Sequence, residues 1–577
     1  MRLLRLKITL VFAAFAARAA ALWPKPQTFV AGTTPLRLSS DFSIVIGGTG
    51  SASQIQSPVD LQRSIDRALE QIKNDRLQRL NVDRGEGNRS EISQADVLST
   101  LELVLTASTT NSISDEINKP YEDLDEAYEL SLPHEPFSSQ PSPGGKTVLL
   151  SANTTLGLAR GLQTFTQLVY HLQSNEDGDE VNYIPNSPLH IFDKPAFLHR
   201  AFMLDTARNF YPVPDILRTL DTMASVKLNV LHWHATDSQS WPLFVPAFPD
   251  LSEFGAENGQ VYTLGDIEKI VAYAGELGIS VMLEIDMPGH TASIAESFPD
   301  YVACHDRRPW MQFSVEPPAG QLKLGNPEVL DFSQRLLKNV SSLFPSKYFS
   351  SGGDEINNAC YEQDPATSAI LASANSTING LLQDFVDGTH YTLIGLGKTP
   401  VVWEELVLGR NLELANETIV LNWISSANVR AVVDKGYRII HAASDYFYLD
   451  CGLGGWLGKN PSGNSWCDPF KTWSKIYSFD PFASLEPSQH DKVVGGEALV
   501  WSEQVDSANL DSIAWPRAAA AAEVFWSGGS IANGTRDVGE ALPRLHDWRY
   551  RALNRGVRAT PLQPHWCALR PGACDLE

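Results

Sequence analysis

Short apolar runs that alternate with helical patterns dominate the chain after residue 195 and restrict its fold more than any other feature. Gly, Pro or polar residues bound each run, and apolar residues at helical spacing follow most of them. Short buried strands joined by helices pair in parallel, and eight of them predict a (β/α)8 TIM barrel, an α/β fold. The predicted strands are residues 200–205, 227–234, 280–285, 348–353, 400–403, 419–423, 438–442 and 493–501.

The helical patterns between these strands support a catalytic barrel at residues 196–577, with a C-terminal helix and tail. Pro212, Pro214 and Pro327 stand where helices begin, and there a missing N–H costs nothing. Residues 444–489 are rich in Gly, Pro and Trp and show no clear helix, so we expect an irregular barrel after the seventh strand. The predicted helices are residues 213–225, 264–277, 327–343, 366–395, 429–435, 516–526 and 535–555.

Residues 22–195 have a mixed pattern that predicts a smaller, non-catalytic α+β domain before the barrel. Its polar residues 81–94 are interpreted as an exposed, cleavable loop. Its residues 115–129 are strongly acidic, and we expect them to form a solvated surface. The predicted strands of this domain are residues 42–46, 100–105 and 148–151, and its helices are residues 58–80 and 155–172.

The N-terminus and the charge of the chain indicate where it works. Residues 1–21 have a basic start, a short apolar run and the small residues Ala19-Ala-Ala21, which predicts a signal peptide and a secreted, extracellular protein. No later run approaches the ~20 apolar residues of a membrane span. The formal net charge of −23 argues against nucleic acid or an anionic membrane surface as partner.

The 6 cysteines fit the same oxidising environment. They lack the CxxC or Cys/His spacing of a zinc site, so disulfides are the better interpretation, although fifteen pairings are possible. Neighbour order suggests Cys304–Cys360, Cys451–Cys467 and Cys567–Cys574. Potential N-glycosylation sites are Asn88, Asn153, Asn339, Asn375, Asn416 and Asn533.

Two glycines and two acids, Gly352 to Glu355, stand at the end of the fourth predicted strand. Glycine permits unusual backbone angles and close approach, whereas two neighbouring negative charges repel each other. The acids fit a helix start, with Asp354 as N-cap and Glu355 in the first turn, or a catalytic site. The barrel favours the catalytic site, because the chemistry of such barrels lies at the C-terminal ends of the strands.

Further polar and aromatic residues follow the other predicted strands at this same end. Aromatic faces stack on sugar rings, and carboxylates and Arg bind hydroxyl groups. Paired carboxylates then suggest glycoside hydrolysis. A metal site is the alternative, but no HExxH-like pair appears, so we predict a hydrogen-bonded network beneath the acid and no metal or cofactor. The candidate ligands in that alternative are His232, His234, Asp237, Asp286 and His290.

Several motifs in the right order resemble glycoside hydrolase family 20, the β-N-acetylhexosaminidases, and most of all their secreted fungal members. The resemblance covers about residues 22–562. It implies an α+β domain before the barrel and a propeptide cleaved near residues 75–100, and it allows a homodimer. The motifs are Leu204-Asp-Thr-Ala-Arg208, Leu231-His-Trp-His-Ala-Thr-Asp-Ser-Gln-Ser240, Asp286-Met-Pro-Gly-His290, Gly353-Asp-Glu355, Tyr448-Leu-Asp450 and Trp501-Ser-Glu503.

The resemblance implies hydrolysis of terminal β-linked GlcNAc, with GalNAc also accepted, from chitin oligomers or glycoconjugates by a substrate-assisted mechanism. Glu355 would be the general acid and then the base, Asp354 would orient the 2-acetamido group, and Tyr448 would bind its carbonyl oxygen. It further implies that Arg208, Asp450 and Glu503 hold sugar hydroxyls, that Trp403, Trp423 and Trp501 wall the pocket, and that Asp237, His290 and Glu404 support it.

A secreted carbohydrate-binding protein with a decayed site is the second hypothesis. The presence of the acid, the orienting aspartate and the tyrosine argues against it. Trp456 and Trp466 lie in the irregular region and suggest contact with a second sugar.

Overall fold

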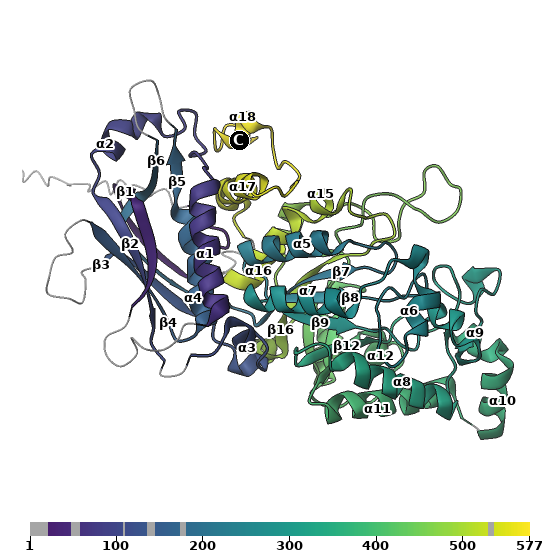
Figure 1. The fold of residues 1–577 in the computed structure, drawn as a ribbon. Coiled ribbons are helices and arrows are strands. Elements are labelled where there is room, and N and C mark those ends of the chain that lie inside the picture. Colours follow the sequence, from purple (N-terminus) through teal and green to yellow (C-terminus); the bar gives the residue numbers. More distant parts are fainter. Residues whose placement is uncertain are drawn as a thin grey trace, which may run out of the picture.

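The computed structural model describes residues 21–47, 58–107, 110–134, 145–173, 180–374, 376–528 and 536–576. Within them, a sheet domain built from the N-terminal part of the chain packs against a barrel domain built from the rest (Figure 1). Residues 1–20 of the predicted signal peptide lie outside the described residues. No helix of the described part is long and apolar enough to cross a membrane.

Eight strands form the closed barrel: β7 (His199–Asp205), β8 (Val230–His234), β9 (Ser280–Glu284), β12 (Tyr348–Gly352), β13 (Thr399–Trp403), β14 (Ile419–Asn422), β15 (Arg438–His441) and β16 (Val493–Val500). All neighbours pair in parallel, and β12 closes the ring on β9 through Ser350 and Glu284. Every residue of β8 and β16 is buried, as expected of strands with helices on one side and a packed interior on the other. The predicted TIM barrel is confirmed.

Most predicted helices of the barrel domain are also found. They are α5 (Val213–Ser225), α7 (Leu264–Glu276), α8 (Pro327–Ser341), α13 (Val429–Asp434), α16 (Arg517–Ser527) and α17 (Val538–Asn554). The single helix predicted at residues 366–395 is wrong. The chain forms α10 (Pro365–Ala374) and α11 (Ile378–Gly395), because the Thr377 side chain caps α11 by accepting from Gly380 N at 3.0 Å.

The stretch between β15 and β16 has the predicted irregular structure. Its described helices are short: α14 (Trp473–Tyr477) and the 3-10 segment η9 (Pro487–Lys492). This leaves a long loop at the C-terminal end of the barrel.

The N-terminal domain is one sheet in the order β1-β2-β4-β3-β6-β5, with α1 (Val59–Asn74) and α4 (Thr155–Leu168) on the side that faces the barrel (Figure 1). Its strands are β1 (Thr28–Gly47), β2 (Val97–Leu105), β3 (Tyr128–His134), β4 (Lys146–Ala152), β5 (Tyr170–Leu172) and β6 (Val181–Asp193). Both predicted helices were too long. The second ends before β5, where Tyr170 pairs with Tyr183 of β6.

Two polar stretches of this domain are more ordered than predicted. The segment interpreted as an exposed loop contains α2 (Arg89–Ser93), and Ile92 is buried against Leu77 and Tyr183. The acidic stretch is not wholly solvated, because Glu126 is buried between Arg160 and Arg200. Each correction has the same cause, which is burial against parts of the chain distant in sequence.

Tryptophans tie the two domains together. Trp23 packs in the barrel-side core and donates from Nε1 to Ala519 O at 2.8 Å. Trp526, at the end of α16, packs in the core of the N-terminal domain and donates to Asp193. Each core therefore contains a ring from the other side of the boundary, which fixes how the barrel sits on the sheet domain.

All three disulfides suggested by neighbour order are present: Cys304–Cys360, Cys451–Cys467 and Cys567–Cys574. Among the sequon residues, Asn88, Asn153 and Asn416 are exposed and Asn339 is half-buried. Asn375 and Asn533 lie outside the described residues.

Candidate active site

β12 ends in a turn that places Glu355 at the rim of the barrel. Gly352, Gly353 and Glu355 have φ values of 64°, 99° and 52°. A Cβ on Gly352 would lie 2.0 Å from a carboxylate oxygen of Asp286, and one on Gly353 would lie 2.6 Å from Leu406. Both positions therefore require glycine. A left-handed backbone at a residue such as Glu355 costs roughly 1–2 kcal/mol and is typically retained at functional sites.

The helix-cap interpretation of the two acids is wrong. The next helix, α9 (Asn358–Gln363), begins beyond them, and Asn357 caps it by accepting from Cys360 N at 3.0 Å. Asp354 and Glu355 are therefore free to serve the pocket above them.

That pocket opens at the C-terminal ends of the strands and has a volume of about 130 Å³. Its floor is buried, whereas Trp466 at its mouth is 66% exposed. Eleven residues selected from the sequence line it: Arg208, His290, Asp354, Glu355, Trp423, Tyr448, Asp450, Trp456, Trp466, Trp501 and Glu503. Residues from several strand ends thus meet at one concave site, as the barrel topology requires.

Arg208 is the positive centre of the pocket. It leaves β7 just after Asp205, which accepts from Arg208 Nη1 at 3.2 Å and from Ser502 N at 3.0 Å, so that β7 and β16 end together. Its Nη2 lies 2.9 Å from Asp237 Oδ2, and its guanidinium lies 5.1 Å from the ring centroid of Trp501. Its Nε donates to Gln239 Oε1 at 3.1 Å and its Nη2 also pairs with Glu316, so every guanidinium nitrogen is held in place at the lining of the cavity.

Asp237, His290 and Glu355 form a line of contacts. His290 Nδ1 lies 3.1 Å from Asp237 Oδ1, and Nε2 lies 3.2 Å from Glu355 Oε2 and 3.7 Å from Asp354 Oδ2. Although burial opposes it, the carboxylates of Asp237 and Asp354 raise the pKa of His290 well above its ordinary value. His290 is thus an imidazolium that contacts both rim acids.

Asp354 is paired with a further buried acid. Asp286 accepts from Gly353 N at 2.8 Å. Burial, followed by the charge of Asp286 and a hydrogen bond with it, raises the pKa of Asp354 well above its ordinary value. Burial also raises the pKa of Asp286, to about 6. The two carboxyls share a proton, and Asp354 is its main holder in the free pocket.

Aromatic rings form one wall of the pocket. The rings of Trp423 and Tyr448 lie nearly parallel, with centroids 6.0 Å apart and an interplanar angle of 9°. Trp466 meets Trp423 edge-on at 5.5 Å. Trp403 is 1% exposed and lies beneath this wall, with its centroid 6.5 Å from Trp423 and 6.0 Å from Trp501.

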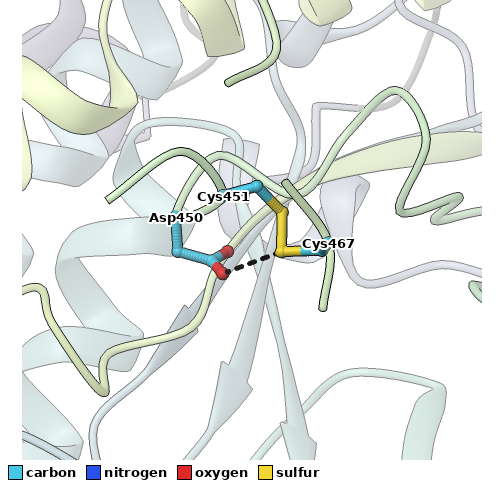
Figure 2. Close-up of side chains that lie close together, drawn as sticks. All are labelled: Asp450, Cys451 and Cys467. Atoms are coloured by element: carbon cyan, nitrogen blue, oxygen red, sulfur yellow. Dashed lines mark hydrogen bonds between the residues drawn. A yellow bond between two sulfur atoms is a disulfide. The ribbon is translucent and has the colours of Figure 1, made fainter. Parts of the chain in front are cut away.

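Asp450 joins the pocket to the irregular loop after β15. It accepts from Trp501 N at 3.4 Å, and burial raises its pKa to about 7. The adjacent Cys451 is bonded to Cys467, whose sulfur lies 3.9 Å from Asp450 Oδ2 (Figure 2). The disulfide therefore closes the loop that carries Trp466 directly beside this acid.

The comparisons with known proteins agree with this geometry. The model for the glycosyl hydrolase family 20 catalytic domain matches residues 197–529, and a beta-acetyl hexosaminidase-like model matches residues 22–168. A beta-hexosaminidase of Arthroderma benhamiae is 38% identical over 83% of this chain and 78% of its own length. A chitooligosaccharidolytic beta-N-acetylglucosaminidase of Bombyx mori is 34% identical over 78% and 75%, respectively.

A solved structure of Flavobacterium johnsoniae chitobiase superposes with a TM-score of 0.71 at 26% identity, over 93% of this chain and 73% of that one. The chain belongs to glycosyl hydrolase family 20. It is accordingly a glycosidase of the β-N-acetylhexosaminidase type.

Two acids, one in this family 20 pocket and one beside its wall, were not predicted from the sequence. Glu316 lines the pocket and pairs with Arg208 from a loop between β9 and β12. Glu405 follows β13 and accepts from Trp423 Nε1 at 2.6 Å; burial, then the charge of Asp354, raises the pKa of Glu405 to about 9. Its signal was the doublet Glu404-Glu405, whereas Glu316 stands in a loop with no periodic pattern.

Glu404, selected from the sequence as a support, faces away from the acids. It accepts from Ile424 N at 2.9 Å and from Asn428 Nδ2 at 3.0 Å, and it also contacts Asn422. It therefore orders the loop after β14, whereas its neighbour Glu405 bonds Trp423 of the pocket wall.

Carboxylates and His290 come close enough in two places to resemble metal ligands, with Asp237 and Glu316 or with Asp286 and Asp354. At the first, the Arg208 guanidinium already lies between the acids. A third group contains Cys451 and Cys467, whose sulfurs are bonded to each other and are not thiolate ligands. Ion pairs and shared protons account for these contacts.

Proposed function

We propose that this chain removes terminal, non-reducing β-linked N-acetylglucosamine or N-acetylgalactosamine from chitin oligomers and glycoconjugates, by a substrate-assisted, retaining mechanism. The observation that carries the proposal is the placement of the two acids. Glu355 and Asp354 lie 3.2 Å and 3.7 Å from one nitrogen of His290, so both stand on one side of the pocket. As adjacent residues on one side, they are poorly placed to flank a glycosidic bond as acid and nucleophile, and a nucleophile in the substrate resolves this.

In the proposed reaction, Glu355 donates a proton to the leaving oxygen while the carbonyl oxygen of the 2-acetamido group attacks C1. The glycosidic bond breaks and an oxazolinium forms. Glu355 then takes a proton from the water that opens it, which restores the acid and retains the configuration. Asp354 as carboxylate offsets the positive charge on the acetamide nitrogen, and Tyr448 donates to the acetamide oxygen.

The shape of the pocket supports exo action. Arg208, Asp450 and Glu503 line it and are suited to bind sugar hydroxyls. The exposed rings of Trp456 and Trp466 at the mouth, 39% and 66% exposed, are suited to stack on the next sugar. A chain end fits this arrangement, whereas the middle of a polymer does not.

The basic, apolar and small-residue order of residues 1–21, the disulfides and the exposed sequons support secretion as a glycoprotein. Cleavage of a propeptide near residues 75–100 and formation of a homodimer remain predictions. N-terminal sequencing of the secreted protein tests the first, and light scattering tests the second.

Two measurements test the mechanism. Glu355→Gln should lower kcat on an aryl β-N-acetylglucosaminide by at least ~10²-fold, the effect of losing a positioned acid. The matching aryl β-glucoside, which lacks the acetamide, should be almost inert with the native enzyme. Near-native turnover by the variant, or rapid hydrolysis of the glucoside, contradicts the proposal. Sugar binding without any turnover by the native protein would instead support the carbohydrate-binding hypothesis.

A further inference from the structure

The contacts behind Glu355 continue far into the barrel. Asp237, which reaches Glu355 through His290, also lies 2.9 Å from His234 Nε2. The opposite nitrogen of His234 lies 2.5 Å from Glu284 Oε1, at the end of β9. Four contacts in series therefore connect Glu284 to Glu355.

Glu284 also begins the lower half of this chain of groups. Its Oε2 lies 2.9 Å from His232 Nε2, and His232 Nδ1 lies 3.2 Å from Glu497 of β16. Glu497 lies 3.5 Å from His199 Nε2 at the start of β7. Acids and imidazoles thus alternate along the barrel interior from its foot to its rim. We call Glu497, His232, Glu284, His234 and Asp237 the axial chain.

The axial chain is buried and charged. Its members are 0–1% exposed. Although burial opposes it, neighbouring carboxylates raise the pKa of His232 to about 9 and that of His234 to about 10. The pKa of Glu497 is lowered despite burial, chiefly by His232. Such burial is expensive unless each charge has its counterpart, and an apolar barrel interior would be simpler to build.

We propose that Glu284, and behind it Glu497, are positioning residues for Glu355 that act through His234, Asp237 and His290. Glu284 and Asp237 hold His234 between them, so His234 presents a fixed positive charge to Asp237. Asp237, oriented by that charge and by Arg208, holds the His290 ring that contacts Glu355. This inference rests on the proposed role of Glu355 as acid and base.

The groups that face Glu284 and His234 from all sides are these. Around Glu284 lie His232, His234, Ser350 of β12 and Trp403 of β13, whose Nε1 is 3.4 Å from Oε1, and its charge also acts on Asp286. Around His234 lie Glu284, Asp237, the charge of Asp205 and the Trp501 ring, whose centroid is 4.8 Å from that of the imidazole. The charged groups named around His234 are thus carboxylates. Asp205 and Asp237 also pair with Arg208, whereas Glu284 has no such contact with Arg208 among the described residues.

Removing the Glu284 charge should therefore let His234 lose its proton at a lower pH. Glu284→Gln keeps the size of the side chain; with its amide oxygen toward Trp403 and His234, its amide nitrogen faces His232 and Ser350. A neutral His234 no longer offsets the charge of Asp237, so the orientation of His290 and Glu355 should weaken as the pH rises. We expect kcat to fall by about tenfold, less than on loss of the acid itself, while KM changes little. The basic limb of the kcat–pH profile should move to lower pH by about one unit or more.

The test measures kcat and KM against pH for the native enzyme, Glu284→Gln, Glu497→Gln and Glu355→Gln. Glu497→Gln should shift the basic limb in the same direction by less, because it acts through His232. The matched control is Asp547→Asn. It removes a buried acid of α17 that is bonded to Arg551 of the same helix and to Tyr170 of β5. It should lower the melting temperature and leave the profile unmoved.

A folded Glu284→Gln enzyme with a native profile overturns the inference. If that variant does not fold, Glu497→Gln decides alone, and a profile equal to that of the native enzyme overturns it. The two proposals fail separately. Substantial activity of Glu355→Gln removes the proposed function, whereas an inactive Glu355→Gln together with native profiles of both axial-chain variants removes only this inference.

Discussion

Two groups of buried charges lie at opposite ends of the barrel, and they differ in how completely they are paired. At the foot, Glu126 of the N-terminal domain accepts from Arg160 Nε at 2.7 Å and from Arg200 Nη2 at 2.7 and 2.8 Å. The other donors of Arg200 reach backbone carbonyls of Phe197 and Lys227 at 2.9 and 3.0 Å. Each guanidinium nitrogen of Arg160 and Arg200 therefore has an acceptor, and the two guanidinium groups share the one carboxylate.

At the rim, acids crowd one another. Asp354 and Asp286 share a proton, Glu405 lies nearby with a pKa raised to about 9 by burial, and burial likewise raises the pKa of Glu503 well above its ordinary value. A saturated cluster, in which every buried donor has an acceptor, stabilises the fold. An unsaturated cluster retains an attraction for a ligand and for positive charge that develops during a reaction.

The largest effect expected from this difference is on stability. Glu126→Gln leaves two buried guanidinium groups with one carboxylate fewer, which should cost about 3–5 kcal/mol of unfolding free energy. At a temperature where the variant is folded, kcat should equal that of the native enzyme. Asp354→Asn should do the reverse, with kcat lower by ~10²-fold or more and stability little changed, because a neutral amide replaces a carboxyl that already holds the shared proton.

Urea unfolding and initial rates, measured on the same preparations, check both halves of this prediction. The comparison breaks down if Glu126→Gln lowers kcat in the folded state as strongly as Asp354→Asn does.

A smaller effect is expected on the acid side of the pH profile. In the proposed mechanism Asp354 acts as a carboxylate, so its raised pKa means that activity is lost as the pH falls through that value. After burial, the charge of Asp286 is the largest cause of the rise. Asp286→Asn removes this charge, so the acid limb of kcat should move to lower pH. A kcat–pH series checks this, and an unmoved or raised limb would show that Asp286 does not control Asp354.

The same contrast explains what could be predicted from the sequence. Strand periods and the position of Gly352 to Glu355 determine the barrel and its functional rim, because a TIM barrel gathers strand ends at one face. Arg208 and Trp501 were therefore found as strand-end residues, and Tyr448 in the loop after the seventh strand. The split between α10 and α11 was missed, since apolar spacing continues through the capping residue Thr377.

Long-range pairing could not be predicted in the same way. Glu126 belongs to an acidic run that is typical of solvated surface, and only the packing of β7 against the N-terminal domain buries it. Glu497 and His232 are 265 residues apart in the chain and meet inside the barrel. Glu316 reaches the pocket from a loop, and no local sequence pattern predicts the path of that loop. A local sequence pattern indicates whether a segment is a helix or a strand, but it does not identify the residue that pairs with a buried charge.

The smallest effect expected concerns the open part of the rim, which has no equivalent at the foot. Trp466 is 66% exposed and touches Trp423 and Tyr448 only edge-on. If it stacks on a second sugar, Trp466→Ala should raise KM for a chitin disaccharide by about 2- to 10-fold, as expected for loss of an aromatic contact worth about 0.5–1.5 kcal/mol. KM for an aryl monosaccharide should change less.

Trp566→Ala, which removes another exposed ring (55%) outside the pocket, is the control and should change neither KM value. Equal effects of Trp466→Ala on both substrates would instead mean that this ring only supports Trp423 and Tyr448, and the open rim would then contribute to the shape of the pocket rather than to the binding of a second sugar.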